Sequence, residues 1–390
     1  MKQTLIPLLV IAAIVGGGIL WWMNLRPVQV TVNGNLESVT IGTTVNQIVS
    51  DEGIQTTAGN YISVGGNVLA EGQGYPYSVT IDDQSMDYDS GSAYKVQGGE
   101  QLSITDGADR MEDYDSEVVE VAPKLTMDSD VGTINYISQW GYPTIKEVRT
   151  GKESGETADG EIYQQGQDCV ISVRDVEPSD GRKLVALTFD DGPSEYTQQY
   201  LEILKEKGVK ATFFCLGAKV EEYPDEAKAI VDAGCQICSH SYSHPDLRTS
   251  DQQTVLDQLT KSFSAIETAT GAKTTTFRPP YGDFTQKTWL LTNGIATVAV
   301  RWNIDTEDWR QPGVDAIVSA ATSSVKSGSI ILMHDGGGDR SQDLEALPKI
   351  IDELQDEGYE FVTISELLQS DDSIPDDIAN CDATMPDDAV

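Results

Sequence analysis

Residues 184–193 read Leu-Val-Ala-Leu-Thr-Phe-Asp-Asp-Gly-Pro, an apolar run that ends in two acidic residues and a turn. A short, uninterrupted apolar run bounded by a Gly-Pro turn is typical of a strand that is buried on both faces. This run is the first of a series that continues towards the C-terminus, at residues 184–189, 211–216, 236–239, 275–277, 297–302, 329–333 and 361–364. Segments with apolar residues at helical spacing lie between them. Because strand and helix alternate about seven times, the sequence predicts an α/β fold whose parallel sheet is closed, or nearly closed, into a barrel.

The chemically useful side chains of this region follow directly on the predicted strands. All three histidines of the chain, His240, His244 and His334, occupy such positions. The other strands are followed by further polar groups, which are Asp190, Asp191, Arg278, Asp305 and Asp308. In (β/α) barrels the carboxyl ends of the strands form one rim, where active sites assemble. We therefore expect these residues to converge on a single site.

Two of the histidines have the spacing of a metal site. His240 and His244 are four residues apart, and neutral imidazoles suit a borderline ion such as Zn²⁺. Asp191 is the expected third ligand. Two histidines and one carboxylate leave open positions on the ion, which is typical of a catalytic site rather than a structural one. An ion there would polarise a carbonyl group and make its bound water acidic enough to attack that carbonyl.

The remaining rim residues are candidates for acid–base catalysis. Neighbouring carboxylates on a turn can point in different directions, so Asp191 can face the metal while Asp190 faces the water bound to it. Asp190 is therefore the candidate general base. Arg278 would pair with Asp190 and keep it ionised and oriented. His334 is the candidate acid that protonates the leaving amine. Asp308 or Asp305 would orient this histidine and raise its pKa.

Five short motifs in this region occur in the order found in one known family. They are Thr188-Phe189-Asp190-Asp191-Gly192-Pro193, His240-Ser241-Tyr242-Ser243-His244, Arg278-Pro279-Pro280-Tyr281-Gly282, Asp305-Thr306-Glu307-Asp308-Trp309 and Leu332-Met333-His334. Residues 183–368 thereby resemble the NodB homology domain of polysaccharide deacetylases, carbohydrate esterase family four. The resemblance implies a distorted (β/α) barrel and a Zn²⁺, Co²⁺ or Ni²⁺ ion, of which we expect Zn²⁺.

The resemblance also implies roles for the polar motif residues. Asp190 matches the base, and Arg278 matches the arginine that positions it. The metal ligands would be Asp191, His240 and His244. His334 matches the acid, and Asp308 the residue that tunes it.

Three further motif residues are expected to contact the substrate. The backbone N–H of Tyr281 would help the metal to hold the oxyanion, Trp309 would line the pocket, and Leu332 would contact the acetyl methyl. The expected reaction is the hydrolysis of N-acetyl groups on a cell-wall or extracellular polysaccharide with N-acetylglucosamine-type sugars. Chitin oligomers and O-acetylated xylan are alternative substrates. A non-catalytic wall-binding protein is an alternative of a different class.

The whole chain divides by composition into five segments. They are a membrane anchor or signal segment at 1–26, a small β-grasp-like module at 27–106, an acidic β-rich connector at 107–182, the deacetylase barrel at 183–370 and an acidic disordered tail at 371–390. Residues 5–23 form an uncharged, mostly apolar run that is long enough to span a bilayer, with a cleaved signal peptide as the alternative. We therefore expect a single-pass cell-membrane protein with an extracellular catalytic domain, or a secreted protein if the segment is cleaved.

The charge and the cysteines exclude some classes of function. A formal net charge of -37 at pH 7 argues against a nucleic-acid partner, since phosphate binding needs a basic surface. Cys235 and Cys238 form a Cys-x-x-Cys pair, but a redox or structural zinc module needs further ligands that the sequence does not offer. We expect both to be buried structural residues. Cys169 and Cys381 are candidates for a disulfide in an oxidising compartment.

Overall fold

The computed structural model describes residues 22–23 and 25–389, which fall into two compact units. The first unit comprises the chain up to Val119 together with Lys146–Tyr163, and the second comprises Glu120–Ile145 and Gln164–Val390. Within the described residues, no helix has both the length and the apolar character that a bilayer crossing requires. The anchor or signal predicted at 1–26 lies, apart from residues 22, 23, 25 and 26, outside the described residues.

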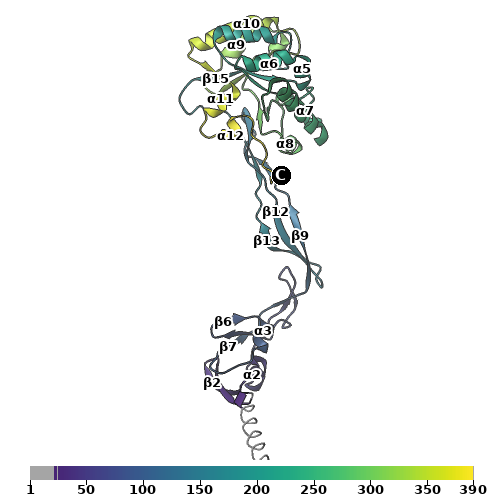
Figure 1. Ribbon diagram of the computed structural model, residues 1–390, viewed down its shortest axis with the longest axis vertical. Helices are drawn as coiled ribbons and strands as arrows, with labels where there is room; N and C mark the ends of the chain where they lie inside the picture. Colours follow the sequence, from purple (N-terminus) through teal and green to yellow (C-terminus); the bar gives the residue numbers. More distant parts are fainter. Residues whose placement is uncertain (1–21, 24, 390) are drawn as a thin grey trace, which may run out of the picture. The chain divides into compact units, whose positions relative to one another are not determined.

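The first unit is built on a mixed five-stranded sheet with the order β2-β1-β7-β5-β6. Figure 1 labels β2, β6 and β7 of this sheet, together with helices α2 and α3. β1 pairs antiparallel with β2 and parallel with β7, and helix α2 packs against the buried side chains of the sheet. The elements are β1 Pro27–Val32, β2 Asn35–Thr40, α2 Val45–Asp51, β5 Tyr77–Ile81, β6 Gln84–Met86, α3 Tyr88–Ala93 and β7 Gln101–Asp106. The β-grasp-like module expected at 27–106 remains a prediction from the sequence.

Two three-stranded sheets lie wholly or mainly in the first unit. One has the order β4-β3-β8 and the other the order β13-β12-β9. Their strands are β3 Tyr61–Ile62, β4 Val68–Ala70, β8 Arg110–Met111, β9 Tyr114–Val121, β12 Thr144–Gly151 and β13 Thr157–Gln164.

The second unit contains the sheet that carries the predicted site. Its order is β10-β14-β11-β19-β18-β17-β16-β15-β21-β20, and β22 also pairs with β15. The strands are β10 Leu125–Met127, β11 Ile134–Gln139, β14 Cys169–Arg174, β15 Leu184–Asp190, β16 Thr212–Cys215, β17 Gln236–Ser239, β18 Thr276–Phe277, β19 Val298–Val300, β20 Ile304–Asp305, β21 Ser329–His334 and β22 Glu360–Phe361. From β19 to β20 in this order, each strand is parallel to its neighbours, as predicted.

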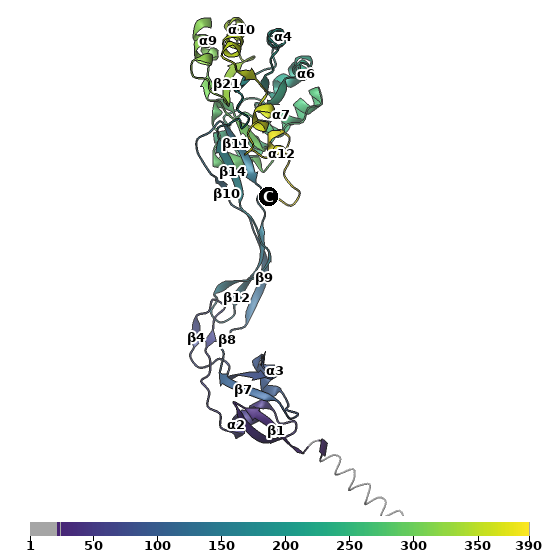
Figure 2. The same ribbon diagram turned by 90° about the vertical axis from the view of Figure 1, so that its left-hand side faces the viewer.

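These seven parallel strands must curl, because β19 and β20 lie at opposite ends of their order although they are neighbours in the sequence. A flat sheet of seven strands would place its outer strands about 29 Å apart, at about 4.8 Å per step. The chain from Val300 to Ile304 reaches at most about 14 Å. The two ends of the parallel sheet therefore approach each other. Strand β19 pairs with β11 rather than with β20. This pairing extends the sheet to β14 and β10, which are labelled beside β11 in Figure 2, and leaves the barrel distorted.

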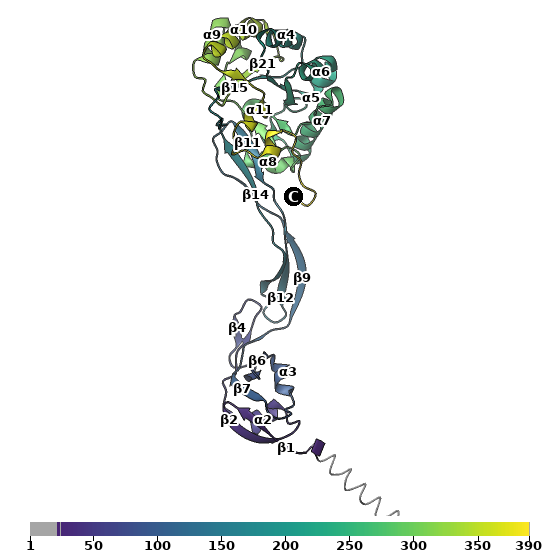
Figure 3. The same cartoon turned by 60° about the vertical axis from the view of Figure 1, so that its left-hand side comes forward.

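Helices surround the parallel strands of this unit (Figure 3). They are α4 Thr197–Lys207, α5 Gly217–Glu222, α6 Pro224–Asp232, α7 Gln252–Thr270, α8 Gln286–Thr292, α9 Val314–Thr322, α10 Ser341–Asp356, α11 Ile364–Gln369 and α12 Asp376–Ala379, with 3-10 turns η1 Leu247–Thr249, η2 Pro280–Gly282 and η3 Asp308–Arg310. The amphipathic helix α10 buries Leu347 and Ile351 in the same core cluster as Leu187 and Phe189 of β15. Such apolar burial is the main source of folding free energy and fixes the strand ends in place.

Residues 107–182 do not form one connector, contrary to the segment predicted from their composition. β9, β12 and β13 belong mainly to the first unit, whereas β10, β11 and β14 extend the barrel sheet of the second. The reason is that the barrel buries apolar residues of both strands: β14 is buried at every second residue, and β11 is buried at its first four. Ile134 and Tyr136 share a core cluster with β19, and Ile171 and Val173 pack in an adjoining one.

The segment 371–390 is ordered up to residue 389, contrary to the tail predicted from its charge. Ile374, Ile378 and Cys381 are buried in a core cluster of the barrel. The carbonyl oxygen of Cys381 accepts a hydrogen bond of 3.0 Å from the backbone N–H of Thr275. Apolar residues at near-helical spacing among the aspartates give this segment a face to bury.

All five cysteines lie within the described residues, and each is a buried free thiol. The disulfide predicted between Cys169 and Cys381 is absent from them, because the two residues belong to different core clusters. Cys235 and Cys238 are buried, as expected, and also pack in different clusters. Their surroundings are apolar, which gives no support to a redox or zinc module.

Candidate active site

The register of the parallel strands brings the predicted residues to one end of the barrel. Asp190, the last residue of β15, pairs with His334, the last residue of β21. The ends of β17 and β18 are likewise paired, so His240 and Arg278 leave the sheet together. Residues that are separated by up to 144 positions in the sequence thus meet at one rim.

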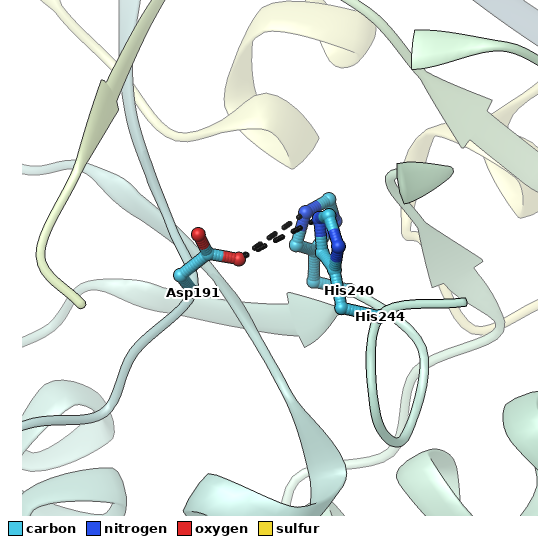
Figure 4. Close-up of side chains that lie close together, drawn as sticks. All are labelled: Asp191, His240 and His244. Atoms are coloured by element: carbon cyan, nitrogen blue, oxygen red, sulfur yellow. Dashed lines mark ion pairs between the residues drawn. The ribbon is translucent and has the colours of Figure 1, made fainter. Parts of the chain in front are cut away.

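Asp191, His240 and His244 form a compact cluster of potential metal ligands (Figure 4). One donor atom from each residue lies within 4.8 Å of the other two. Asp191 Oδ1 is 3.7 Å from Nε2 of each histidine, and it is buried with no hydrogen-bond partner among the described residues. Asp191 and His244 have φ angles of 69° and 62°, a strained backbone that clusters at functional sites. Three converging donors, one of them otherwise unsatisfied, fit a divalent ion.

His240 has the protonation state and the orientation that a metal ligand needs. Its Nδ1 donates a hydrogen bond of 2.8 Å to the carbonyl oxygen of Arg278, which turns Nε2 towards Asp191. Burial lowers the pKa of His240 to about 3, although Asp191 opposes the shift. The imidazole is therefore neutral at physiological pH, which is the form that binds metal ions.

Asp190 lies beside this cluster in a buried ion pair. Its Oδ1 accepts a hydrogen bond of 2.7 Å from Arg278 Nη1, and its Oδ2 is 3.6 Å from His240 Nε2. Arg278 is completely buried, donates to Thr188 Oγ1 and packs 4.1 Å from the centroid of the Phe214 ring. Burial raises the pKa of Asp190, and the Arg278 guanidinium opposes that rise. A fixed carboxylate in this setting is suited to take a proton.

His334 is held by Asp308, which begins the 3-10 turn η3. The Asp308 carboxylate is fully buried, and it accepts hydrogen bonds from His334 Nδ1 at 2.8 Å and from the His334 backbone N–H at 2.7 Å. Burial opposes the charged imidazole, but the hydrogen bond and charge of Asp308 outweigh it, so the pKa of His334 rises to about 9. Asp305, the alternative partner, is exposed and accepts instead from the backbone N–H of Glu307.

The three predicted substrate contacts differ in exposure. Tyr281 and Trp309 expose 61% and 52% of their surface. The Tyr281 ring lies edge-on to the ring of His244, with 4.7 Å between the centroids. Leu332 is buried in β21, where it pairs with Asp305 of β20. The structure thus places two exposed aromatic rings on residues next to the site and an apolar side chain within the barrel.

The similarity to known proteins falls on the second unit. Residues 177–298 match the family model described as polysaccharide deacetylase. A peptidoglycan-N-acetylglucosamine deacetylase of Bacillus cereus is 37% identical over 196 residues, which are 50% of this chain and 92% of that protein. The chain belongs to the polysaccharide deacetylase family.

A second curated relative agrees with this membership, and one solved structure is similar in sequence. A chitooligosaccharide deacetylase of Sinorhizobium fredii is 36% identical over 191 residues, which cover 46% of this chain and 89% of that protein. A crystal structure of a peptidoglycan N-acetylglucosamine deacetylase is 35% identical, with a TM-score of 0.47, and covers 50% of this chain and 91% of that one. The family predicted from the five motifs is confirmed, and the chain is a hydrolytic deacetylase.

Three buried charged residues of this deacetylase lie near the predicted acid but escape the sequence analysis. They are Asp335, Arg340 and Asp343. Asp335 accepts a hydrogen bond of 2.5 Å from Thr197 Oγ1, and a Cβ added at Gly192 would collide with its carboxylate. This close approach explains the glycine of the first motif. The position of Asp335 directly after His334 is the signal that would have drawn attention to it.

Proposed function

We propose that this deacetylase hydrolyses N-acetyl groups of N-acetylglucosamine-type sugars in a cell-wall polysaccharide, with the help of a divalent metal ion. The observation that supports the proposal most directly is the pairing of Asp190 with His334 at the strand ends, beside the Asp191, His240 and His244 cluster. A base, an acid and a set of metal ligands then share one rim, which is what hydrolysis of an amide requires.

The ligand cluster fits the ion that the family implies. Asp191, His240 and His244 would hold it, leaving coordination positions open for substrate and water. A divalent ion held there supplies Lewis-acid polarisation of a carbonyl group and lowers the pKa of water. The N and O donors suit Zn²⁺, and also Co²⁺ or Ni²⁺.

Asp190 would act as the general base. It accepts the proton of the water whose oxygen forms the new bond to the acetyl carbon. The hydrogen bond from Arg278 Nη1 at 2.7 Å fixes the carboxylate and favours its ionised form. Arg278 is therefore a positioning residue, locked by Thr188 and by the backbone carbonyls of Val300 and Arg301.

His334 would act as the general acid when the carbon–nitrogen bond breaks. Its Nδ1 is engaged by Asp308, so Nε2 is the nitrogen that would transfer a proton to the leaving amine. The carboxylate of Asp308 stabilises the imidazolium and fixes the ring. The products are acetate and a free amino group on the sugar.

The relatives support an N-acetylglucosamine polymer as the substrate, because they are named as peptidoglycan and chitooligosaccharide deacetylases. The backbone N–H of Tyr281 would help the metal to hold the oxyanion, the exposed ring of Trp309 would line the pocket, and Leu332 would meet the acetyl methyl. A cell-wall substrate requires an extracellular enzyme. We propose that residues 1–26 place the chain there, as an anchor or as a signal segment.

The direct test measures acetate released from purified peptidoglycan, N-acetylated chitin oligomers and O-acetylated xylan. We expect release from the first two, loss of release after treatment with a chelator, and its recovery on adding Zn²⁺, Co²⁺ or Ni²⁺. Thiol alkylation of the folded enzyme should have no effect, since all five cysteines are buried. Metal binding without acetate release from any glycan would favour the non-catalytic wall-binding protein instead.

The alkaline limit of activity should depend on Asp308. His334 donates only when protonated, so turnover should fall as the pH rises through about 9. The variant Asp308→Asn removes the negative charge that offsets the burial of His334. The pKa of His334 should therefore fall to 6.5 or below. At pH 8 the loss of protonated histidine alone lowers kcat about thirtyfold. Asp305→Asn is the matched control, and an alkaline limit that moves equally in both variants would contradict the assignment of Asp308.

A further inference from the structure

A buried group of charges lies behind the proposed acid. Arg340, at the start of α10, places Nη1 at 3.6 Å from Asp308 Oδ2 and at 3.7 Å from Asp343 Oδ2. Arg340 is 3% exposed, and both carboxylates are completely buried. The Asp308 oxygens already accept three hydrogen bonds, two from His334 and one from the backbone N–H of Trp309. Arg340 therefore acts on Asp308 through charge at close range.

The same residues have unused hydrogen-bonding capacity. Among the described residues, Arg340 Nε and Nη1 are buried without a hydrogen-bond partner, and the Asp343 carboxyl has only the Asp308 carboxyl as a partner. Buried polar atoms without partners are costly, and such atoms in a native protein call for a reason beyond packing. A charge that acts on the neighbouring acid is such a reason.

The titratable and charged groups around His334 come from several elements. They are Asp190 and Asp191 from the end of β15 and its following turn, Tyr200 from α4, Asp308 from η3, Asp335 next to His334 itself, and Arg340 and Asp343 from α10 and its start. Tyr200 donates its hydroxyl hydrogen to the carbonyl oxygen of His334. Arg340 is the cation of this set, and it would repel an imidazolium at His334 if Asp343 did not offset it.

We propose that Arg340 and Asp343 are a compensating pair of positioning residues, which act through Asp308 to set the pH range in which His334 remains protonated. Arg340 keeps Asp308 ionised against its burial, and Asp343 cancels the repulsion between Arg340 and the His334 imidazolium. The inference rests on the proposed role of His334 as the acid. Burial and the Asp308 carboxylate raise the pKa of Asp343 to about 7, so Asp343 is an anion in the range where His334 titrates.

The test compares the full-length wild-type chain with Asp343→Asn and with the double variant Arg340→Met/Asp343→Asn. Asparagine is close to aspartate in shape, so the single variant removes the charge and leaves Arg340 uncompensated. We expect the alkaline limit of kcat to move down by about one pH unit, which is about a fivefold loss at pH 9 with little change at pH 6.5. The double variant removes both charges, and its limit should return to near the wild-type value.

A second readout follows the His334 imidazole directly, by NMR titration of the metal-free chain labelled in histidine. The chain has three histidines, and loss of one signal in His334→Gln assigns the resonance. We expect the same downward shift in Asp343→Asn and its reversal in the double variant. An unchanged His334 titration in folded Asp343→Asn overturns the inference. If the titration moves and the kcat profile does not, the charge pair stands and the proposed acid role of His334 falls.

Discussion

Asp190→Asn should lower acetate release by about a hundred- to ten-thousandfold, the range that a general base contributes. Asparagine cannot accept the proton of the attacking water. Its Oδ1 can still accept the hydrogen bond that Arg278 Nη1 gives to Asp190 at 2.7 Å, so the buried arginine keeps a partner. We therefore expect the loss to fall on kcat, with KM nearly unchanged.

Two measurements separate this chemical effect from damage to the site. Calorimetric titration of the chelator-treated variant with Zn²⁺ should give nearly the wild-type affinity, because Asp190 is not one of the proposed ligands. Thermal unfolding should show a smaller loss than the roughly 3–5 kcal/mol that results when a buried ion pair loses one partner completely. A variant that is folded but no longer binds the metal would show that Asp190, and not Asp191, is the ligand.

The barrel is predictable from the sequence because buried parallel strands have a distinctive pattern. An uninterrupted apolar run such as 184–189 is not expected on a strand that has one face in solvent. The observed bounds of β15 and β21 differ from the predicted runs by no more than one residue. β11 and β14 are assigned to a β-rich connector and not to the barrel, because a local pattern shows that a strand is buried but not which core buries it. The short β20, residues 304–305, is a strand through its pairing with β21, and no local pattern marks it.

The site residues likewise fall into two groups: those that a local sequence pattern identifies and those that only the tertiary structure brings together. Asp191, His240 and His244 are found because ligands must be of certain residue types and follow strand ends. Arg340 and Asp343 are not found, since a charged residue at the start of a helix and an aspartate in its first turn are ordinary features of solvated helices. Burial turns them into neighbours of Asp308, and burial here is set by how α10 packs on the barrel.

Asp191→Asn should have the opposite signature to Asp190→Asn, although the two residues are adjacent and the change is the same. Asp191 Oδ1 is the buried oxygen that faces both His240 and His244 at 3.7 Å and has no other partner among the described residues. Replacing this carboxylate removes the anionic ligand and leaves two neutral imidazoles. We expect the affinity for Zn²⁺ to fall by more than about a hundredfold, since even the outer partners of metal ligands contribute ten- to a hundredfold.

The dependence on metal concentration distinguishes the two aspartates. Activity of Asp191→Asn should be lost at low Zn²⁺ and recover in part when the metal is raised, because the base Asp190 and the acid His334 are still in place. Activity of Asp190→Asn should not recover at any metal concentration. If instead excess metal rescues Asp190→Asn and has no effect on Asp191→Asn, the base and the ligand are exchanged. If both variants keep wild-type activity, the ligand cluster does not serve hydrolysis, and the proposed function is wrong.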